Sequence, residues 1–187
     1  LRHDEILTLF HETGHGLHHL LTQVDELGVS GINGVEWDAV ELPSQFMENF
    51  VWEYDVLTQM SAHEETGAAL PKELFDKMLA AKNFQRGLFL VRQMEFALFD
   101  MTIYSEDDEG RLKNWPQVLD SVRKEVAVIQ PPEYNRFALS FSHIFAGGYS
   151  AGYYSYAWAE VLSADAYAAF EESDDVAATG KRFWQEI

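Results

Sequence analysis

The chain has 187 residues, of which 47% are hydrophobic and 14% aromatic, so it holds enough apolar side chains for one substantial core. It contains no cysteine, which excludes a disulfide framework and a cysteine-based metal site and favours an intracellular, cytoplasmic protein. Thirteen Lys and Arg against 31 Asp and Glu give a net charge of -18, which argues against a nucleic-acid partner.

Helical periodicity dominates the sequence, which predicts a mainly α fold with little or no sheet. The first helix runs from about Asp4 to about Val24, and glycines mark a loop over residues 28–34. A second helix runs to about Ala62. Its start is placed near Asp38 or near Pro43, because proline is tolerated in the first turn of a helix and is costly deeper in. Later helices are expected over residues 71–84, 88–103, 115–128, a short stretch after 131–132, and 153–170.

Residues 105–110 form an acidic segment that lacks an EF-hand spacing and is therefore expected to be a solvated turn. No apolar run approaches the roughly 20 residues of a membrane span, and the first residues have none of the parts of a signal peptide. No membrane partner is therefore expected. The last residues, 181–187, stop within an amphipathic pattern, so residues 1–187 are expected to be a single-domain fragment whose partner is the rest of a longer polypeptide.

The sequence H-E-T-G-H at residues 11–15 matches the zincin pattern H-E-x-x-H inside an apolar, helical stretch. A helix advances about 100° per residue, so His11 and His15 project from nearly the same side on successive turns. Two imidazoles can then share one zinc ion, and the carboxylate of Glu12 can take a proton from a bound water. The motif predicts zinc-dependent hydrolysis with one Zn²⁺ per chain.

A chance match is the alternative, since a chain with 7 His and many Glu reaches this pattern at roughly the few per cent level. An inert histidine pair usually lies on a solvated helix face, whereas the residues around this motif are apolar. Gly14 and Gly16 each cost a helix up to about 1 kcal/mol relative to alanine, which suggests a close backbone approach at the motif.

A catalytic zinc normally takes three protein ligands and keeps a fourth position for water, so one more ligand is needed. Glu36, Asp38 and Glu41 follow a loop that could fold the second helix back against the first. Spacing alone does not choose the third ligand. The candidates are His3, His18, His19, His63, His143 and several carboxylates.

Two stretches resemble the thimet oligopeptidase family: H-E-T-G-H-G-L-H-H from residue 11, and V-E-W-D-A-V-E-L-P-S-Q-F-M-E-N from residue 35. In that family the Glu of the E-L-P-S-Q segment is the third zinc ligand, which falls on Glu41. The resemblance also implies that Asp38 is a hydrogen-bond partner of a ligand histidine and fixes its tautomer. Thr13 departs from the family, in which an aromatic residue is usual there, and this change bears on packing more than on chemistry.

The resemblance extends to residues 141–160, F-S-H-I-F-A-G-G-Y-S-A-G-Y-Y-S-Y-A-W-A-E. It implies that His143 and Tyr156 lie near the scissile carbonyl, with the Tyr156 hydroxyl donating to the developing oxyanion. It also implies that Tyr149 and Tyr153 line the substrate site. The plainer interpretation is that a Tyr or His on an aromatic-rich helix belongs to the core or its rim, and for Tyr149 and Tyr153 the two interpretations are close.

The resemblance thus implies a zincin-type, multi-helix catalytic domain of a zinc metalloendopeptidase that cleaves internal bonds of short peptides. Two alternatives stay open. The first is a dipeptidyl carboxypeptidase of the same family, although the W-D-A-V-E-L wording favours the oligopeptidase branch. The second is a helical fragment that binds zinc and is inactive without the missing regions, because the family's longer members enclose peptides in a deep channel.

Overall fold

The computed structural model describes residues 2–105 and 114–187, and every regular element in these two ranges is a helix. The prediction of a mainly α fold is therefore confirmed. None of the helices in these ranges is long and apolar enough to cross a membrane. Residues 106–110 of the predicted acidic turn lie outside the described part of the chain.

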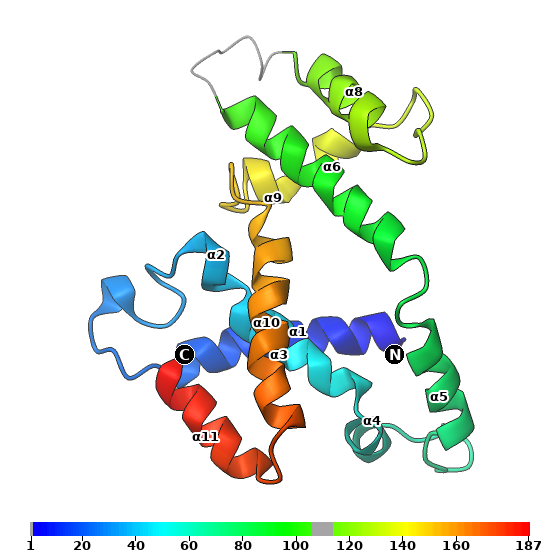
Figure 1. Ribbon diagram of the computed structural model, residues 1–187, viewed down its shortest axis with the longest axis vertical. Coiled ribbons are helices and arrows are strands. Elements are labelled where there is room, and N and C mark those ends of the chain that lie inside the picture. The colour runs from blue at the N-terminus through cyan, green and yellow to red at the C-terminus, as the bar shows by residue number, and fades with distance from the viewer. Residues whose placement is uncertain (1, 106–113) are drawn as a thin grey trace. The chain divides into compact units, whose positions relative to one another are not determined.

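The chain divides into two compact units: unit 1 comprises Leu1–Lys82 with Tyr156–Ile187, and unit 2 comprises Asn83–Ser155. Unit 1 opens with α1, which ends about four residues before the predicted position. Its elements are α1 (His3–Leu20), η1 (Leu27–Val29), α2 (Trp37–Val40), α3 (Leu42–Glu48), η2 (Asn49–Trp52), α4 (Tyr54–Met60), α5 (Lys72–Ala81), nearly all of α10 (Ser155–Glu171), and α11 (Val176–Glu186) (Figure 1).

The predicted second helix is wrong as a single element, because the structure divides it into α2, α3, η2 and α4. Glu41 is the residue between α2 and α3, with φ -90° and ψ 0°. Pro43 then lies in the first turn of α3, where its missing N–H costs no helical hydrogen bond. A second break follows at Glu53, which has an extended backbone between η2 and α4.

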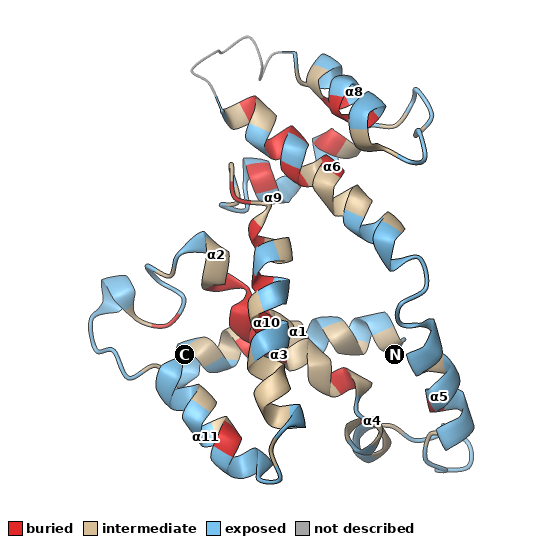
Figure 2. Ribbon diagram, in the orientation of Figure 1, coloured by how far each residue is buried: buried red, intermediate tan, exposed pale blue. Residues whose placement is uncertain are grey.

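The core of unit 1 lies around α3. Figure 2 shows that buried residues are concentrated in the α2–α3 segment, where Val40, Glu41, Leu42, Pro43, Ser44 and Phe46 are all buried. On one side α3 packs against α1. On another side the ring of Phe46 stacks on Phe183 of α11 at 4.1 Å and meets Phe170 of α10 at 5.1 Å. These contacts hold α3 between three other helices of the unit.

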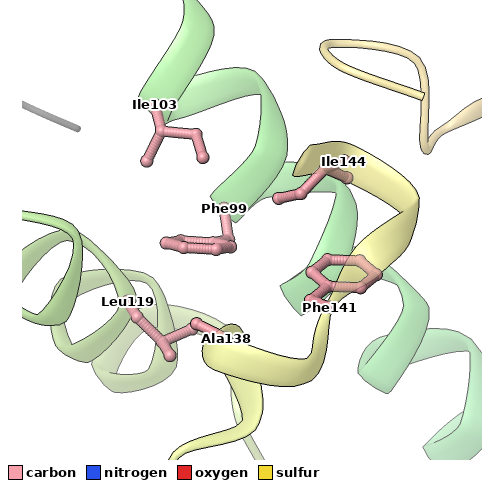
Figure 3. Close-up of a cluster of buried hydrophobic side chains, with 6 residues drawn as sticks. All are labelled: Phe99, Ile103, Leu119, Ala138, Phe141 and Ile144. Carbon is pink, nitrogen blue, oxygen red and sulfur yellow. The ribbon is translucent and has the colours of Figure 1, made fainter. Parts of the chain in front are cut away.

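Unit 2 contains α6 (Arg86–Tyr104), α8 (Trp115–Val126), η3 (Phe137–Ser140) and α9 (Ser142–Phe145). Its hydrophobic core draws residues from all of these elements, namely Phe99, Ile103, Leu119, Ala138, Phe141 and Ile144 (Figure 3). A buried ion pair joins the carboxylate of Glu95 on α6 to Arg123 on α8, whose Nε donates at 2.8 Å. The two long helices of this unit are therefore fixed by apolar packing and by one buried charge pair.

Candidate metal centre

The two motif histidines lie on the face of α1 that meets α3. Their rings are 5.0 Å apart between centroids, with an interplanar angle of 86°, and both side chains are about one-fifth exposed. A cation between them would therefore be reached from solvent on one side and enclosed by protein on the other. This arrangement follows from the helical i, i+4 spacing of His11 and His15.

Gly14 allows α1 and α3 to approach closely. A Cβ built at this residue would lie 2.4 Å from the carbonyl oxygen of Pro43 and 2.5 Å from the Cα of Ser44. The expected close backbone approach is thus confirmed at Gly14. It does not occur at Gly16, where a Cβ would meet nothing within 4 Å.

Because the two helices touch at Gly14, the residue that precedes α3 lies opposite the motif. The Glu41 side chain is 1% exposed, and its Oε2 is 3.3 Å from Nε2 of His11 and 3.1 Å from Nε2 of His15. Ligand atoms bound to one tetrahedral zinc at 2.0–2.2 Å lie roughly 3.3–3.6 Å from one another. The spacing of these donor atoms in the structure is close to that value.

These three residues form a group whose candidate ligand atoms all lie within 4.8 Å of one another. Two imidazole nitrogens and one carboxylate oxygen are a donor set typical of catalytic zinc, which leaves a coordination position open. Of the third-ligand candidates within the described residues, Glu41 is the one that forms a group with both histidines.

Two hydrogen bonds orient this donor set. Glu48 Oε1 lies 2.7 Å from Nδ1 of His11, so an Nδ1–H donated to that carboxylate leaves Nε2 free for a metal. The buried hydroxyl of Ser44 donates to Glu41 Oε2 at 2.7 Å and lies 2.9 Å from the Glu41 carbonyl oxygen. Each of these contacts holds a potential ligand in place without any metal.

The same carboxylates determine the protonation of His11. Burial, the largest effect, lowers the pKa of His11, but the hydrogen bonds and charges of Glu41 and Glu48 act in the opposite direction. The net result is a pKa raised to about 9.

Sequence reasoning missed Glu48 and assigned the histidine-orienting role to Asp38. The missed signal is a spacing of seven residues from Glu41, which is about two turns of the helix that begins directly after Glu41. Asp38 lies half-buried on α2, and its role stays a prediction. Nδ1 of His15 is buried and has no hydrogen-bond partner within the described ranges.

Glu12, the predicted base, follows His11 directly on α1 and is exposed. The other histidines of this unit lie in different surroundings. His3 packs edge-on against Trp52 at 4.3 Å, and burial lowers its pKa. His63 accepts backbone N–H groups of a turn, and His19 lies against Gly31.

The second set of predicted residues falls mainly in unit 2. The His143 ring is 6.1 Å from Tyr149 and 5.7 Å from Tyr153, so the structure brings these three together. The Tyr153 hydroxyl donates to Gln93 Oε1 at 3.0 Å. Burial raises the pKa of Tyr153 to about 12, against a smaller opposite effect of Arg92.

Tyr156 belongs to unit 1, where it is half-buried in the first turn of α10. Its carbonyl oxygen accepts a hydrogen bond of 2.9 Å from Nε2 of Gln45, which lies on α3 directly after Ser44. The E-L-P-S-Q segment thus carries the acidic candidate ligand at its first residue and a tie to the Tyr156 backbone at its last.

Comparison with known proteins agrees with the resemblance drawn from the motifs. The chain is 60% identical over 170 residues to oligopeptidase A of Salmonella typhimurium, a match that covers 91% of the chain and 25% of the relative. It is 56% identical over 186 residues to oligopeptidase A of Haemophilus influenzae, covering 99% of the chain and 27% of the relative. A dipeptidyl carboxypeptidase of Escherichia coli is 34% identical over 189 residues, covering 98% of the chain and 27% of the relative.

The chain therefore spans about a quarter of the length of these curated relatives. The family model described as Peptidase family M3 matches residues 1–187. The expected resemblance to thimet oligopeptidases and to oligopeptidase A is confirmed at this level. The chain belongs to Peptidase family M3.

Proposed function

We propose that this chain is the zinc-binding catalytic portion of a metalloendopeptidase that hydrolyses internal bonds of short oligopeptides. The observation that carries the proposal is the convergence of His11, His15 and Glu41 next to the candidate base Glu12, in a chain of the M3 family. Two imidazole nitrogens and a carboxylate oxygen suit Zn²⁺, a borderline cation that has no strong geometric preference of its own.

In this proposal His11, His15 and Glu41 hold the ion. Bound zinc would polarise the scissile carbonyl and increase the acidity of water. Glu12 accepts a proton from the water that attacks the carbonyl carbon and passes it to the departing amine, so that its charge is restored at the end of each cycle. The Tyr156 hydroxyl donates to the oxygen that becomes negative, His143 lies near the scissile carbonyl, and Tyr149 and Tyr153 line the peptide site.

The assignment of Glu12 is tested by Glu12→Gln in the full-length protein. The variant should bind one equivalent of zinc and lose at least about a thousandfold in kcat, because the amide cannot accept the proton. Glu26→Gln, a substitution at an exposed glutamate of the same unit, is the matched control and should leave kcat unchanged. Near-normal peptide cleavage by the Glu12→Gln protein would show that another group is the base.

An exopeptidase is the nearer alternative, and the 34% identity to a dipeptidyl carboxypeptidase motivates it. A peptide blocked at both ends separates the two activities. Internal cuts in the blocked peptide are expected for the endopeptidase. A requirement for a free C-terminal carboxylate would favour the exopeptidase.

A zinc-binding fragment without activity of its own is the other alternative, motivated by the quarter-length coverage of the relatives. Peptide cleavage by residues 1–187 is compared with cleavage by the full-length protein, each loaded with zinc. Equal activity would exclude the need for the rest of the polypeptide. A cytoplasmic location, short peptides as substrates and the rest of the polypeptide as partner remain predictions.

A further inference from the structure

One face of α6 contacts the segment that carries His143, Tyr149 and Tyr153. Gln93, Phe96, Asp100 and Tyr104 follow one another at intervals of three, four and four residues, which places them in a single stripe along the helix. The Tyr104 hydroxyl donates to the carbonyl oxygen of Ile144 at 2.7 Å. All of these residues belong to unit 2, so this face of α6 and the segment it contacts lie in one compact unit.

Two of the stripe residues contact the side chain of Tyr153. The ring of Phe96 meets the Tyr153 ring at 5.8 Å between centroids in an edge-on arrangement. Oε1 of Gln93 accepts a hydrogen bond from the Tyr153 hydroxyl. The Tyr153 side chain is therefore held at both its ring and its hydroxyl. The backbone on the N-terminal side of Tyr153 is held by a different residue of the stripe.

That residue is Asp100, which is fully buried at 0% exposure. Its Oδ1 accepts the N–H of Ala151 at 2.8 Å, and its Oδ2 accepts the N–H of Tyr153 at 2.9 Å. Successive backbone N–H groups around a left-handed residue form a concave site for an anion. Ala151 is that residue, with φ +55°.

Ala151 adopts the left-handed conformation at the residue whose N–H donates to Asp100. Few non-glycine residues adopt this conformation unless their surroundings stabilise it. Burial of a carboxylate is also unfavourable unless it is hydrogen-bonded, and here backbone N–H groups of the loop satisfy Asp100. Both costs are offset by the same set of hydrogen bonds, which therefore fix residues 151–153 in one arrangement.

The start of this loop is held separately, on α9. The N–H of Tyr149 donates to the carbonyl oxygen of His143 at 3.0 Å, and the hydroxyl of Ser150 donates to the carbonyl oxygen of Ile144 at 2.7 Å. Tyr149 thus lies between one attachment at α9 and another at Asp100. Loss of Asp100 would remove the attachment of the backbone on the C-terminal side of Tyr149.

We propose that Asp100 is a positioning residue of the peptide-binding site, which fixes the loop of Tyr149 and Tyr153 by binding its backbone N–H groups. The proposal rests on the proposed function, since these tyrosines are taken to contact peptide. Asp100 itself takes no part in the chemistry. It acts through the loop, and so its removal weakens substrate binding while the donor set of unit 1 is untouched.

The test compares Asp100→Asn with Glu95→Gln in the full-length protein. Glu95 is a buried carboxylate on the same helix, but it pairs with Arg92 and Arg123 and has no hydrogen bond to the loop. Both variants weaken unit 2, and only the first changes the loop. The readouts are zinc content, kcat and KM for a short peptide, and hydrogen exchange at the amides of residues 151–153.

For Asp100→Asn we expect one equivalent of zinc, a KM raised about tenfold, a kcat within about twofold of wild type, and exchange at residues 151 and 153 accelerated at least about tenfold. Glu95→Gln should leave KM and this exchange unchanged. Unchanged exchange and KM in Asp100→Asn would overturn the proposal, and so would an equal rise of KM in Glu95→Gln, which would mark a general loss of stability.

A second variant, Asp100→Ser, is used if Asp100→Asn does not fold, because a small hydroxyl costs less to bury than an unpaired amide. It should give the same rise in KM and the same faster exchange at residues 151 and 153. Failure of the proposed function is a distinct result. In that case the wild-type protein would cleave no peptide, whereas the exchange measurement would still report whether Asp100 holds the loop.

Discussion

Gly14→Ala tests whether the close approach of α1 and α3 sets the geometry of the metal site. The added methyl group would lie 2.4 Å from the Pro43 carbonyl oxygen and 2.5 Å from the Ser44 Cα, which are backbone atoms that no side-chain rotation removes. Such contacts need about 3.5 Å, so the helices must separate by roughly 1 Å. Overpacking costs about 1–3 kcal/mol and the better helix propensity of alanine offsets about 1 kcal/mol, which leaves a net loss of roughly 0–2 kcal/mol.

The effect on zinc should be larger than the effect on stability. His15 is adjacent to Gly14 on α1, and Glu41 lies two residues before Pro43, so a separation of roughly 1 Å pulls two candidate ligands apart. Coordination distances tolerate only about 0.2 Å, and we therefore expect zinc affinity to fall about 100-fold. The dissociation constant is measured by competition with a chelator, and thermal unfolding is followed on the same samples.

Gly16→Ala is the matched control, because it makes the same change on the same helix with nothing within 4 Å of the new methyl group. It should bind zinc like wild type and gain up to about 1 kcal/mol in stability. If Gly14→Ala also kept the wild-type zinc affinity, the close approach at Gly14 would not be what holds Glu41 against the histidines.

Two further predictions concern Glu48 and zinc affinity, and Tyr153 and the pH dependence of stability. Glu48→Gln keeps the shape of the group that accepts the Nδ1–H of His11 but removes its charge. Zinc affinity should therefore fall about 10–100-fold. Equal zinc affinities for this variant and Glu26→Gln would refute the orienting role of Glu48. Burial raises the pKa of Tyr153 from 10.0 to about 12, so the native state keeps a proton that the unfolded chain loses. The resulting stability is fully present below pH 10.0 and is lost as the pH rises through about 12. The urea midpoint should therefore fall more between about pH 9 and about pH 11 in wild type than in Tyr153→Phe, and parallel falls would contradict this linkage.

The parts of the site that the sequence predicts are those set by local geometry. The pairing of His11 with His15 needs only a continuous helix, and the cost of a helical glycine pointed to the close approach at Gly14. The third ligand was different. Its spacing from the motif left several candidates, and the family resemblance singled out Glu41 before the structure brought it to the histidines.

The contacts that the sequence did not predict all depend on how distant elements pack. Glu48 became a partner of His11 only through the crossing of α1 and α3, across 37 residues of sequence. In the sequence, Asp100 is one polar residue within a largely apolar predicted helix. The backbone N–H groups that donate to it lie 51 and 53 residues further along the chain. The break at Glu41 was also hidden, because Pro43 fits either the start of a new helix or the first turn of a longer one.

The candidate metal centre and the tyrosines proposed to bind peptide differ in what they need from the rest of the protein. The three candidate ligands and the groups that orient them, Ser44 and Glu48, lie within residues 11–48 of unit 1, on α1, on α3 and at the residue directly before α3. The candidate zinc site is therefore contained in a short stretch of the sequence, and the packing of α1 against α3 brings its residues together. The loop of Tyr149 and Tyr153 takes its shape from α6 in unit 2, through Asp100. Metal affinity should accordingly respond to substitutions at the α1–α3 contact and peptide affinity to substitutions on α6, so the two properties can be changed independently.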